Sequence, residues 1–167
     1  MTSIAHIVSG IIEVADDYWG GTQAIIWIND ERLTPESLAG LGRLLAPGIG
    51  LLLPPQRQND LHFGARPARN NPEWPTTSYF AHRNMRKINW IGVSRCRLIK
   101  VDGMDLHVAE LDAVNGTPVL DVKPWFSEFG PRGAVPTANW STEMLSDHTG
   151  RPVAWSRQRE ERPATAL

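Results

Sequence analysis

Three short strand-like segments follow one another between residues 90 and 125, with only a few turn residues between them. They read WIGVSRCRLIKV at residues 90–101, MDLHVAEL at 104–111 and TPVLDVKPW at 117–125. The dipeptide Asp102-Gly103 separates the first two, and such a pair between alternating runs is a strong signal for a β-hairpin. Several short strands at such close spacing are typical of a mostly antiparallel sheet. This part of the chain therefore predicts an antiparallel sheet or a barrel.

The N-terminal half predicts further strands of the same kind. AHIVSGIIEV at residues 5–14 and QAIIWI at 23–28 predict a hairpin-like pair, and GIGLLLPP at 48–55 is typical of a buried strand that two prolines stop. One clear helix is expected over residues 35–45, with Thr34 as its N-cap. No Gly-rich turn of the Rossmann kind joins a strand to a helix. The predicted fold is mostly β, a small antiparallel barrel with one or two short helices.

Two stretches interrupt or follow this strand pattern. Residues 56–78 are rich in Pro, Asn and Arg and predict a long loop, which in a compact domain is usually functional or mobile. SYFAH at 78–82 then predicts a return to strand structure. After Phe126 the pattern fades, so we expect one domain over residues 1–130 and an irregular extension with a polar tail over 131–167.

Composition is that of a soluble globular protein. The 167 residues are enough to enclose a core, and 41% of them are hydrophobic while 21% are charged. No apolar run reaches the roughly 18 residues that a membrane helix requires, and the first residues lack the pattern of a secretory signal. We therefore expect a cytoplasmic protein that does not enter a membrane.

Charge is distributed unevenly along the chain, although the net charge is -1. Residues 57–100 contain nine Lys and Arg against two Asp and Glu, and the segments on both sides are acidic. Arg side chains in such a stretch can bind phosphate or carboxylate through two hydrogen bonds at once. The alternative is a solvated basic face, which charge alone favours.

Neither cysteine nor histidine predicts a reactive or metal site. Cys96 is the single cysteine, so an internal disulfide is excluded, and we expect it to pack beside a strand. None of the five histidines has a second histidine three or four residues away, the spacing that places two ligands on one helix face. No metal site is predicted.

Two segments about twenty residues apart carry a resemblance when they are read together. FAHRNMRKINWIGVS and LDAVNGTPVLDVKPW resemble the two signature stretches of the TsaA-like, or TrmO-like, S-adenosylmethionine-dependent methyltransferase family, F-A-x-R-S-P-x-R-P-N-x-I-G-L-S and L-D-x-x-D-G-T-P-V-L-D-I-K-P-Y. The first stretch is matched by Phe80, Ala81, Arg83, Asn89, Ile91, Gly92 and Ser94. The second is matched by Leu111, Asp112, Gly116, Thr117, Pro118, Val119, Leu120, Asp121, Lys123 and Pro124. DDYWGG and HFGARPARNNPEWP are similar to the short-chain branch of that family.

The resemblance implies a small β-barrel methyltransferase, unlike the Rossmann-type enzymes. It implies a homodimer that binds S-adenosylmethionine close to the subunit interface. The family's cofactor contacts come from the Arg of the first motif, from the residue after its Ile-Gly and from the backbone before Gly-Thr-Pro. Carried over to this chain, and with the Asn of the first motif added, the candidates are Arg83, Asn89, Val93, Leu111, Asp112, Ala113 and Val114.

The catalytic and acceptor-binding candidates are two aspartates, one lysine and three tryptophans. Methyl transfer needs in-line positioning more than acid–base help, but Asp121 or Asp112 could accept a proton from an amine, or each could be a structural hydrogen-bond acceptor. The acceptor is expected to meet Lys123 and aromatic rings, which can stack on a base or a cation. Burial at the sheet edge is the alternative for each tryptophan. The aromatic candidates are Trp19, Trp90 and Trp125.

Departures from the family pattern bear on the acceptor. Ile88 and Trp90 replace two prolines of the first motif, and an upstream His that the family usually carries is missing or moved. The family's best-known activity is methylation of a threonylcarbamoyl-modified adenosine beside the tRNA anticodon, by bacterial members with an additional C-terminal domain. This chain ends about forty residues after the second motif, and nucleic-acid binding normally requires a clear positive surplus.

The sequence therefore predicts methyl transfer to a small molecule with a nitrogen, oxygen or carbon nucleophile. One alternative is a tRNA adenosine methyltransferase whose RNA surface is formed by residues 57–100. Another is a barrel that binds S-adenosylmethionine or a nucleoside without catalysis, or that uses the cofactor for a different reaction.

Overall fold

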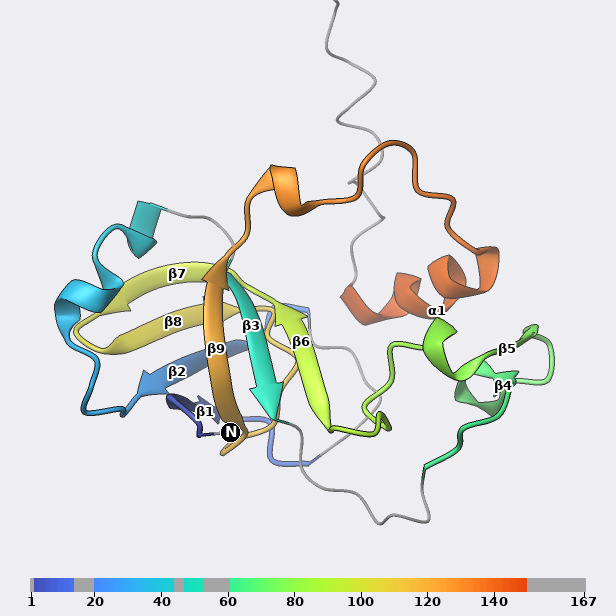
Figure 1. The fold of residues 1–167 in the computed structure, drawn as a ribbon, viewed down its shortest axis with the longest axis horizontal. Coiled ribbons are helices and arrows are strands. Elements are labelled where there is room, and N and C mark those ends of the chain that lie inside the picture. The colour runs from blue at the N-terminus through green and yellow to red at the C-terminus, as the bar shows by residue number, and fades with distance from the viewer. Residues whose placement is uncertain (1, 14–19, 44–46, 53–60, 150–167) are drawn as a thin grey trace, which may run out of the picture.

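A curled seven-stranded antiparallel sheet forms most of the molecule (Figure 1). The computed structural model describes residues 2–13, 20–43, 47–52 and 61–149, with the backbone alone at 47–52 and 146–149. The expected polar tail at 155–167 lies outside the described residues. The strand order is β6-β3-β9-β1-β2-β8-β7. The strands are β1 (Ala5–Ser9), β2 (Gln23–Ile28), β3 (Pro47–Leu52), β6 (Ile91–Arg95), β7 (Arg97–Asp102), β8 (Asp105–Ala109) and β9 (Pro118–Pro124).

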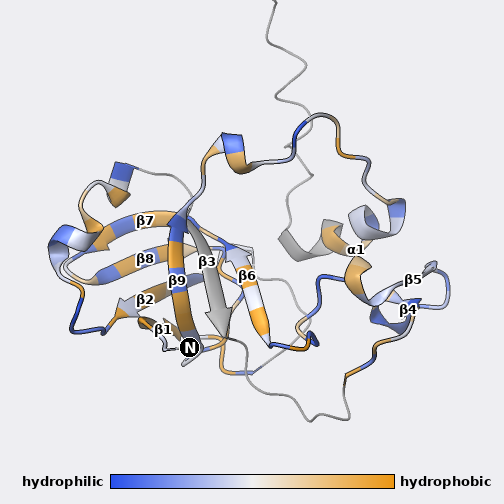
Figure 2. Ribbon diagram, viewed as in Figure 1, coloured by the Kyte–Doolittle hydropathy of each residue, from blue (hydrophilic) through white to orange (hydrophobic). Residues whose placement is uncertain are grey.

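Both predicted hairpins are confirmed. β1 pairs antiparallel with β2, and β7 pairs antiparallel with β8. The β7–β8 turn begins after Asp102, and Gly103 has a φ of +60°, a conformation that glycine adopts without steric cost. Figure 2 shows hydrophobic and hydrophilic residues alternating along β8, as expected for a strand with one buried face.

The sheet curls because its two edge strands are consecutive in sequence. The sequence predicted one strand over residues 90–101, but the structure divides it at Cys96 into β6 and β7, which lie at opposite edges. Only Cys96 connects β6 to β7, and in a flat sheet a single residue could not join strands at opposite edges. β9, β3 and β6 accordingly cross in front of β1, β2, β8 and β7 in Figure 1. This arrangement confirms the predicted mostly β, barrel-like fold, in the form of a half-barrel.

The concave side of the curled sheet encloses the core. Cys96 lies in it at 4% exposure, and burial raises the pKa of its thiol to about 12, so this cysteine is a packed residue as expected. β1, β2 and β8 supply most of the core by burying alternate positions. The buried cluster comprises Ala5, Ile7, Ala24, Ile26, Ile28, Cys96, Leu98, Leu106, Val108, Leu111, Ala113 and Val119.

Two local predictions were wrong. The expected helix over residues 35–45 is instead a pair of short 3-10 helices, η1 (Pro35–Leu38) and η2 (Leu41–Arg43). Gly40 between them has a φ of +83°, which a right-handed helix cannot contain. SYFAH is not a strand, because Tyr79–Ala81 forms the 3-10 helix η5, in which the Ala81 N–H donates to the Ser78 carbonyl.

The predicted long loop and the C-terminal extension both contain regular structure. β4 (Arg66–Pro67) and β5 (Thr76–Thr77) form a two-stranded sheet, and α1 (Asn139–Thr149) is an α-helix that the sequence did not predict. Trp74 Nε1 donates to Glu143 Oε2 at 3.2 Å, so α1 packs beside this small sheet (Figure 1). No helix in the described part of the chain has the length and apolar character needed to cross a membrane.

Candidate functional site

Side chains of the two motifs meet on one surface of β6, β3 and β9. Directly opposed residues of antiparallel strands point to the same side of a sheet, and two rows of such residues cross this surface, each with a glycine of β3 in the middle. The rows are Val93-Gly50-Asp121 and Arg95-Gly48-Lys123. Because glycine has no side chain, β3 contributes only backbone between the flanking side chains. We call this surface the β6–β9 face; its side chains are those of Val93, Arg95, Asp121 and Lys123.

Arg83 reaches the β6–β9 face from the loop that precedes β6. Its Nη2 donates a hydrogen bond to the Val93 carbonyl oxygen at 3.2 Å. Val93 itself is 63% exposed, so the strand is open to solvent at this point. Two of the predicted cofactor residues, ten positions apart in sequence, are thereby brought together.

Arg95 adds a second guanidinium group beside Arg83. Its Cζ atom lies 3.7 Å from the ring centroid of Trp125, a cation–π contact between β6 and the residue after β9. The pKa of Arg95 is lowered from its usual value by burial and, secondly, by the positive charge of Arg83. No acidic side chain of the described residues forms an ion pair with either arginine. An anion bound here would relieve the repulsion between the two cations.

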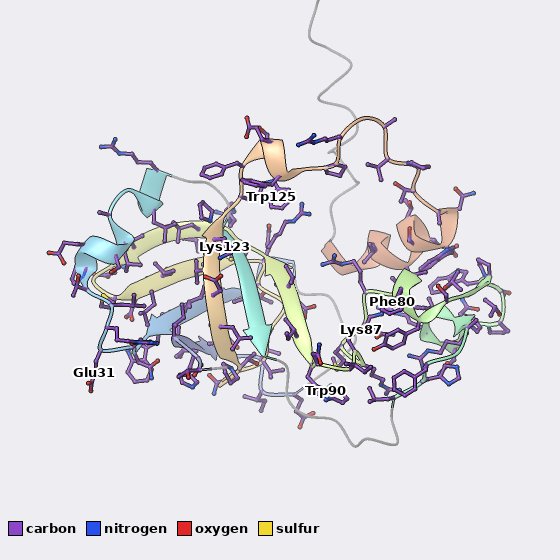
Figure 3. All side chains as sticks on the ribbon, in the orientation of Figure 1. Glu31, Phe80, Lys87, Trp90, Lys123 and Trp125 are labelled. Atoms are coloured by element: carbon purple, nitrogen blue, oxygen red, sulfur yellow. The ribbon has the colours of Figure 1, made fainter. Side chains whose placement is uncertain are left out.

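Asp121 and Lys123 form an ion pair two residues apart on β9. Figure 3 shows Lys123 on β9 and Trp125 just beyond the strand's end. Both side chains of the ion pair are at least half exposed, at 51% for Asp121 and 75% for Lys123. A pair this exposed contributes little to stability. The carboxylate and the ammonium are therefore both accessible to a ligand on this face.

The loop before the second motif's Gly-Thr-Pro exposes one carboxylate, that of Asp112. Leu111 and Ala113 are buried in the core at 1% and 8% exposure, whereas Asp112 is exposed and Val114 partly so. The side chains at 111 and 113 therefore anchor the loop and cannot contact a ligand. A ligand can reach the side chain of Asp112 and, in part, that of Val114.

The Asn115-Gly116 turn fixes this loop to the end of β1. The Gly116 N–H donates to the Ile7 carbonyl at 2.7 Å, and Asn115 Oδ1 accepts from the Ser9 N–H at 3.1 Å. Gly116 has a φ of +78°, which explains why glycine stands at this position. Thr117, the next residue, is 2% exposed, and no described group hydrogen-bonds to its hydroxyl.

The remaining predicted residues lie apart from these contacts. Asn89 is exposed and lines an open cavity of about 300 Å³ in front of β6. Trp90 has a φ of +54°, and its N–H donates to the Lys87 carbonyl at 3.0 Å, so it forms part of the turn into β6. Trp19 lies outside the described residues.

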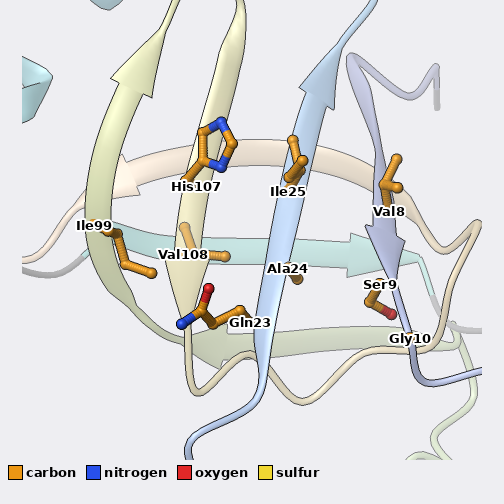
Figure 4. Close-up of a pocket in the computed structure, with 9 residues that line it drawn as sticks. All are labelled: Val8, Ser9, Gly10, Gln23, Ala24, Ile25, Ile99, His107 and Val108. Carbon is orange, nitrogen blue, oxygen red and sulfur yellow. The ribbon is translucent and has the colours of Figure 1, made fainter.

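Arg95 is the functional candidate that sequence reasoning missed. It follows Val93 at the two-residue period of a strand, and that spacing was the available signal. A second open cavity of about 310 Å³ lies on the outer face of β1, β2, β8 and β7, where Val8, Ile25 and His107 line it (Figure 4). It contains none of the predicted residues. Among the described residues, no three His, Cys, Asp or Glu side chains gather as metal ligands do.

Comparison with known proteins adds related sequences. A 41% identical segment of 56 residues is shared with a probable S-adenosyl-L-methionine-binding protein of Pyrococcus abyssi, covering 34% of this chain and 30% of that protein. The human tRNA (adenine(37)-N6)-methyltransferase is 33% identical over 82 residues, which are 48% of this chain and 18% of the human protein. The chain thus spans less than a third of these relatives.

Solved structures of the same fold are also found. A crystal structure of TrmO from Pseudomonas aeruginosa superposes with a TM-score of 0.64 at 20% identity, over 84% of this chain and 62% of that one. Another TrmO crystal structure gives a TM-score of 0.58 at 20% identity, over 100% and 88%. At this identity the likeness concerns the fold. The model of the tRNA-methyltransferase O N-terminal domain matches residues 18–130, both motifs included, and the chain therefore belongs to this family.

Proposed function

We propose that this protein is an S-adenosylmethionine-dependent methyltransferase that methylates an adenine nitrogen of tRNA. Family membership supports it, as do relatives named tRNA (adenine(37)-N6)-methyltransferase and probable S-adenosyl-L-methionine-binding protein. These names favour the tRNA alternative over the small-molecule acceptor expected from the sequence. That expectation rested partly on a net charge of -1, which averages a basic segment over residues 57–100 with its acidic flanks.

Arg83 and Arg95 locate the proposed cofactor site on the β6–β9 face. They lie next to each other, and neither has an acidic partner among the described residues. Two guanidinium groups suit the carboxylate of the cofactor's amino-acid part. Carbonyl oxygens of residues 111–114 and the carboxylate of Asp112 suit a positively charged sulfonium, and Asn89 can hydrogen-bond a further polar group of the cofactor. When bound, the cofactor supplies a methyl group on that positive sulfur, an electrophile.

Asp121 is the stronger candidate for a proton acceptor. It shares the β6–β9 face with Val93 and Arg95, and its carboxylate is half exposed. An adenine amino nitrogen must lose a proton as it gains the methyl group, and a positioned carboxylate can take that proton. Lys123 keeps a positive charge beside this carboxylate, and Lys123 and Trp125 would meet the RNA at the end of β9.

A homodimer with the cofactor near the subunit interface is part of the proposal, as the resemblance implies. The loop of residues 111–114 and the β6–β9 face would then complete each other between two copies. Light scattering of the purified protein measures this directly, and a monomer at all concentrations would remove the dimer from the proposal.

Calorimetric titration with S-adenosylmethionine tests the cofactor site. Arg83→Ala is expected to weaken binding by about tenfold or more, because a charge-assisted hydrogen bond is worth about 1.5–3 kcal/mol. Arg97→Ala is the matched control, since Arg97 is an exposed arginine of the same basic segment at the opposite edge of the sheet. Equal affinity of the two variants would mean that Arg83 is structural, and no binding to the wild type at millimolar cofactor would overturn the proposed function.

The acceptor is tested separately by mass spectrometry of nucleosides. Unmodified tRNA transcripts and tRNA from cells are incubated with the protein and cofactor and then digested. The proposal expects a methylated adenosine derivative in one of the two tRNA pools. Transfer of the methyl group to a small metabolite, with none to tRNA, would restore the small-molecule alternative.

A further inference from the structure

An exposed group of aromatic rings surrounds one lysine next to the β6–β9 face. Phe80 is 89% exposed and Phe63 is 60% exposed, and both rings contact Tyr79. The Tyr79 and Phe80 rings meet edge to face with centroids 5.1 Å apart, and those of Phe63 and Tyr79 are 5.7 Å apart. Lys87 Nζ lies 4.2 Å from the Tyr79 centroid and 5.9 Å from that of Phe80. We call Phe63, Tyr79, Phe80 and Lys87 the aromatic platform.

Local contacts hold the aromatic platform in place. Lys87 Nζ donates to the Tyr79 carbonyl oxygen, and the Tyr79 hydroxyl accepts from the Ile88 N–H at 2.8 Å. The short helix η5 therefore cannot move independently of the turn that follows it. A platform fixed before binding loses little conformational freedom when a ligand arrives.

The described part of the chain offers no reason for Phe80 to be exposed. A fully buried phenylalanine would gain about 1.5–3 kcal/mol, so a ring left 89% exposed points to a surface that contacts a partner. Next to it lies the open cavity of about 300 Å³, with Asn89 and Ile91 on its other side. Figure 3 shows Phe80 and Lys87 on the same side of the molecule, beyond β6.

The positive charge around the aromatic platform indicates a partner that carries negative charge. The surrounding segment, residues 57–100, has nine basic residues against two acidic ones. Arg66 lies close enough to Lys87 for its charge to lower the pKa of the lysine, after the larger effect of burial. In the proposed cofactor site, Arg83 and Arg95 already match the single carboxylate of a sulfonium amino acid, so a second cationic surface suits a ligand with several negative charges. A polynucleotide offers flat bases for the rings and phosphates for the cations.

We propose that the aromatic platform stacks an unpaired base of the RNA substrate, while Lys87, Arg66 and Arg86 contact the phosphates beside it. The inference rests on the proposed function for the identity of the RNA. It assigns to η5 and the following turn a base-binding role beside Asn89, a residue that the proposed function gives to the cofactor and that lines the same cavity. Stacking needs an unpaired base, whereas phosphate contacts form with any RNA, so a hairpin loop should bind more tightly than a continuous duplex.

Fluorescence anisotropy with a labelled RNA hairpin carrying a seven-nucleotide loop tests the platform, and a blunt RNA duplex of equal length is the comparison. Phe80→Ala is expected to weaken hairpin binding by about tenfold or more and Phe80→Trp to retain it, because stacking on an aromatic ring is lost in the first variant alone. Trp27→Ala is the matched control, since Trp27 is an aromatic residue that is 51% exposed on β2, in the other half of the curled sheet. Phe80 is exposed, so its replacement does not disturb the core.

The salt dependence of RNA binding distinguishes the contribution of base stacking from that of phosphate contacts. Phe80→Ala should leave the slope of binding constant against salt concentration unchanged, whereas Arg86→Ala should reduce it by about one phosphate contact. Unchanged hairpin affinity in Phe80→Ala overturns the proposal. So does an equal loss of cofactor affinity, which would place the platform in the cofactor site, or a change of oligomeric state, which would mean that a second copy covers it.

The platform and the proposed function fail in different ways. If the wild type neither binds the cofactor nor methylates tRNA, but hairpin binding still depends on Phe80, the platform stands and the proposed function falls. If the wild type methylates tRNA and Phe80→Ala does so with unchanged KM, the function stands and the platform falls.

Discussion

The two halves of the curled sheet use the same kind of strand for different purposes. In the half formed by β1, β2, β8 and β7, alternate side chains are buried, and Ile26 and Leu106 are 0% exposed. In the half formed by β6, β3 and β9, β6 buries none of its five residues. One half therefore supplies most of the buried core, whereas the other, which buries Val119 of β9, presents the side chains of the β6–β9 face to solvent.

An exposed charge pair does not by itself distinguish the halves. Lys100 and Asp102 on β7 form an ion pair two residues apart, as Lys123 and Asp121 do on β9. What differs is the neighbourhood: Asp121 shares its face with Arg95 and Val93, and Arg95 lies over Trp125. The residues around an ion pair, and not the pair itself, indicate a functional site. Substitutions in the two pairs can therefore be compared directly.

The largest expected effect is on catalysis. Asp121→Asn removes the proposed proton acceptor but keeps the shape of the side chain, and the rate of tRNA methylation should fall by about 100- to 10,000-fold. Asp102→Asn in the other half, which has the same spacing to its lysine, should leave the rate unchanged. The measurement is single-turnover methyl transfer. Equal rates for Asp121→Asn and the wild type would show that Asp121 is a structural acceptor.

The next largest effect is expected on the reactivity of the Cys96 thiol, which lies where β6 and β7 join. Burial holds the pKa of Cys96 at about 12, above its ordinary value of 9.0, so at pH 8 its thiolate fraction is lower by roughly a thousandfold. Reaction with a disulfide reagent should be slower by at least that factor than in denaturant. The pKa is raised in the folded state, so the protonated thiol is favoured at neutral pH and folding should weaken only as pH rises past 9. Rapid native labelling would mean that the two halves separate readily.

The smallest expected effect is on the free energy of unfolding, compared between a buried and an exposed residue of the two halves. Ile26→Val removes a single methylene from the buried half and should lower the free energy of unfolding by about 0.5–1.5 kcal/mol. Val93→Ala removes more carbon from the exposed half and should change it by at most about 0.5 kcal/mol. Denaturant unfolding of both variants measures this. A larger loss in Val93→Ala would show that β6 is covered in solution, as it would be by a second copy of the chain.

Much of the sheet and part of the site could be predicted because their signals are local. The Asp102-Gly103 turn and the alternation around it indicate a hairpin without reference to the rest of the chain. Arg83 and Val93 were found through the motif, and the structure joins them by a hydrogen bond. Arg95 was missed, because nothing local says that its guanidinium lies over Trp125, thirty positions later.

The wrong local predictions have a common cause. Residues 35–45 have helical spacing of leucines, but Gly40 takes a left-handed conformation and divides them. Residues 139–149 form α1 although their sequence has weak amphipathic character, and the contact of Trp74 with Glu143 helps to hold this helix in place. Propensity is a weak guide wherever packing against distant residues decides the outcome.

The sequence by itself determined the β1–β2 and β7–β8 hairpins, the packing of Cys96 and the family, since each depends on residues near one another along the chain. Only the tertiary structure decided that the run from residue 91 to 102 breaks at Cys96 and spans both edges of the sheet. The same curl places β6 beside β3 and β3 beside β9, which brings Arg83, Arg95 and Trp125 together. The physical reason is that register and curl follow from how the whole core closes, and no short segment contains that information.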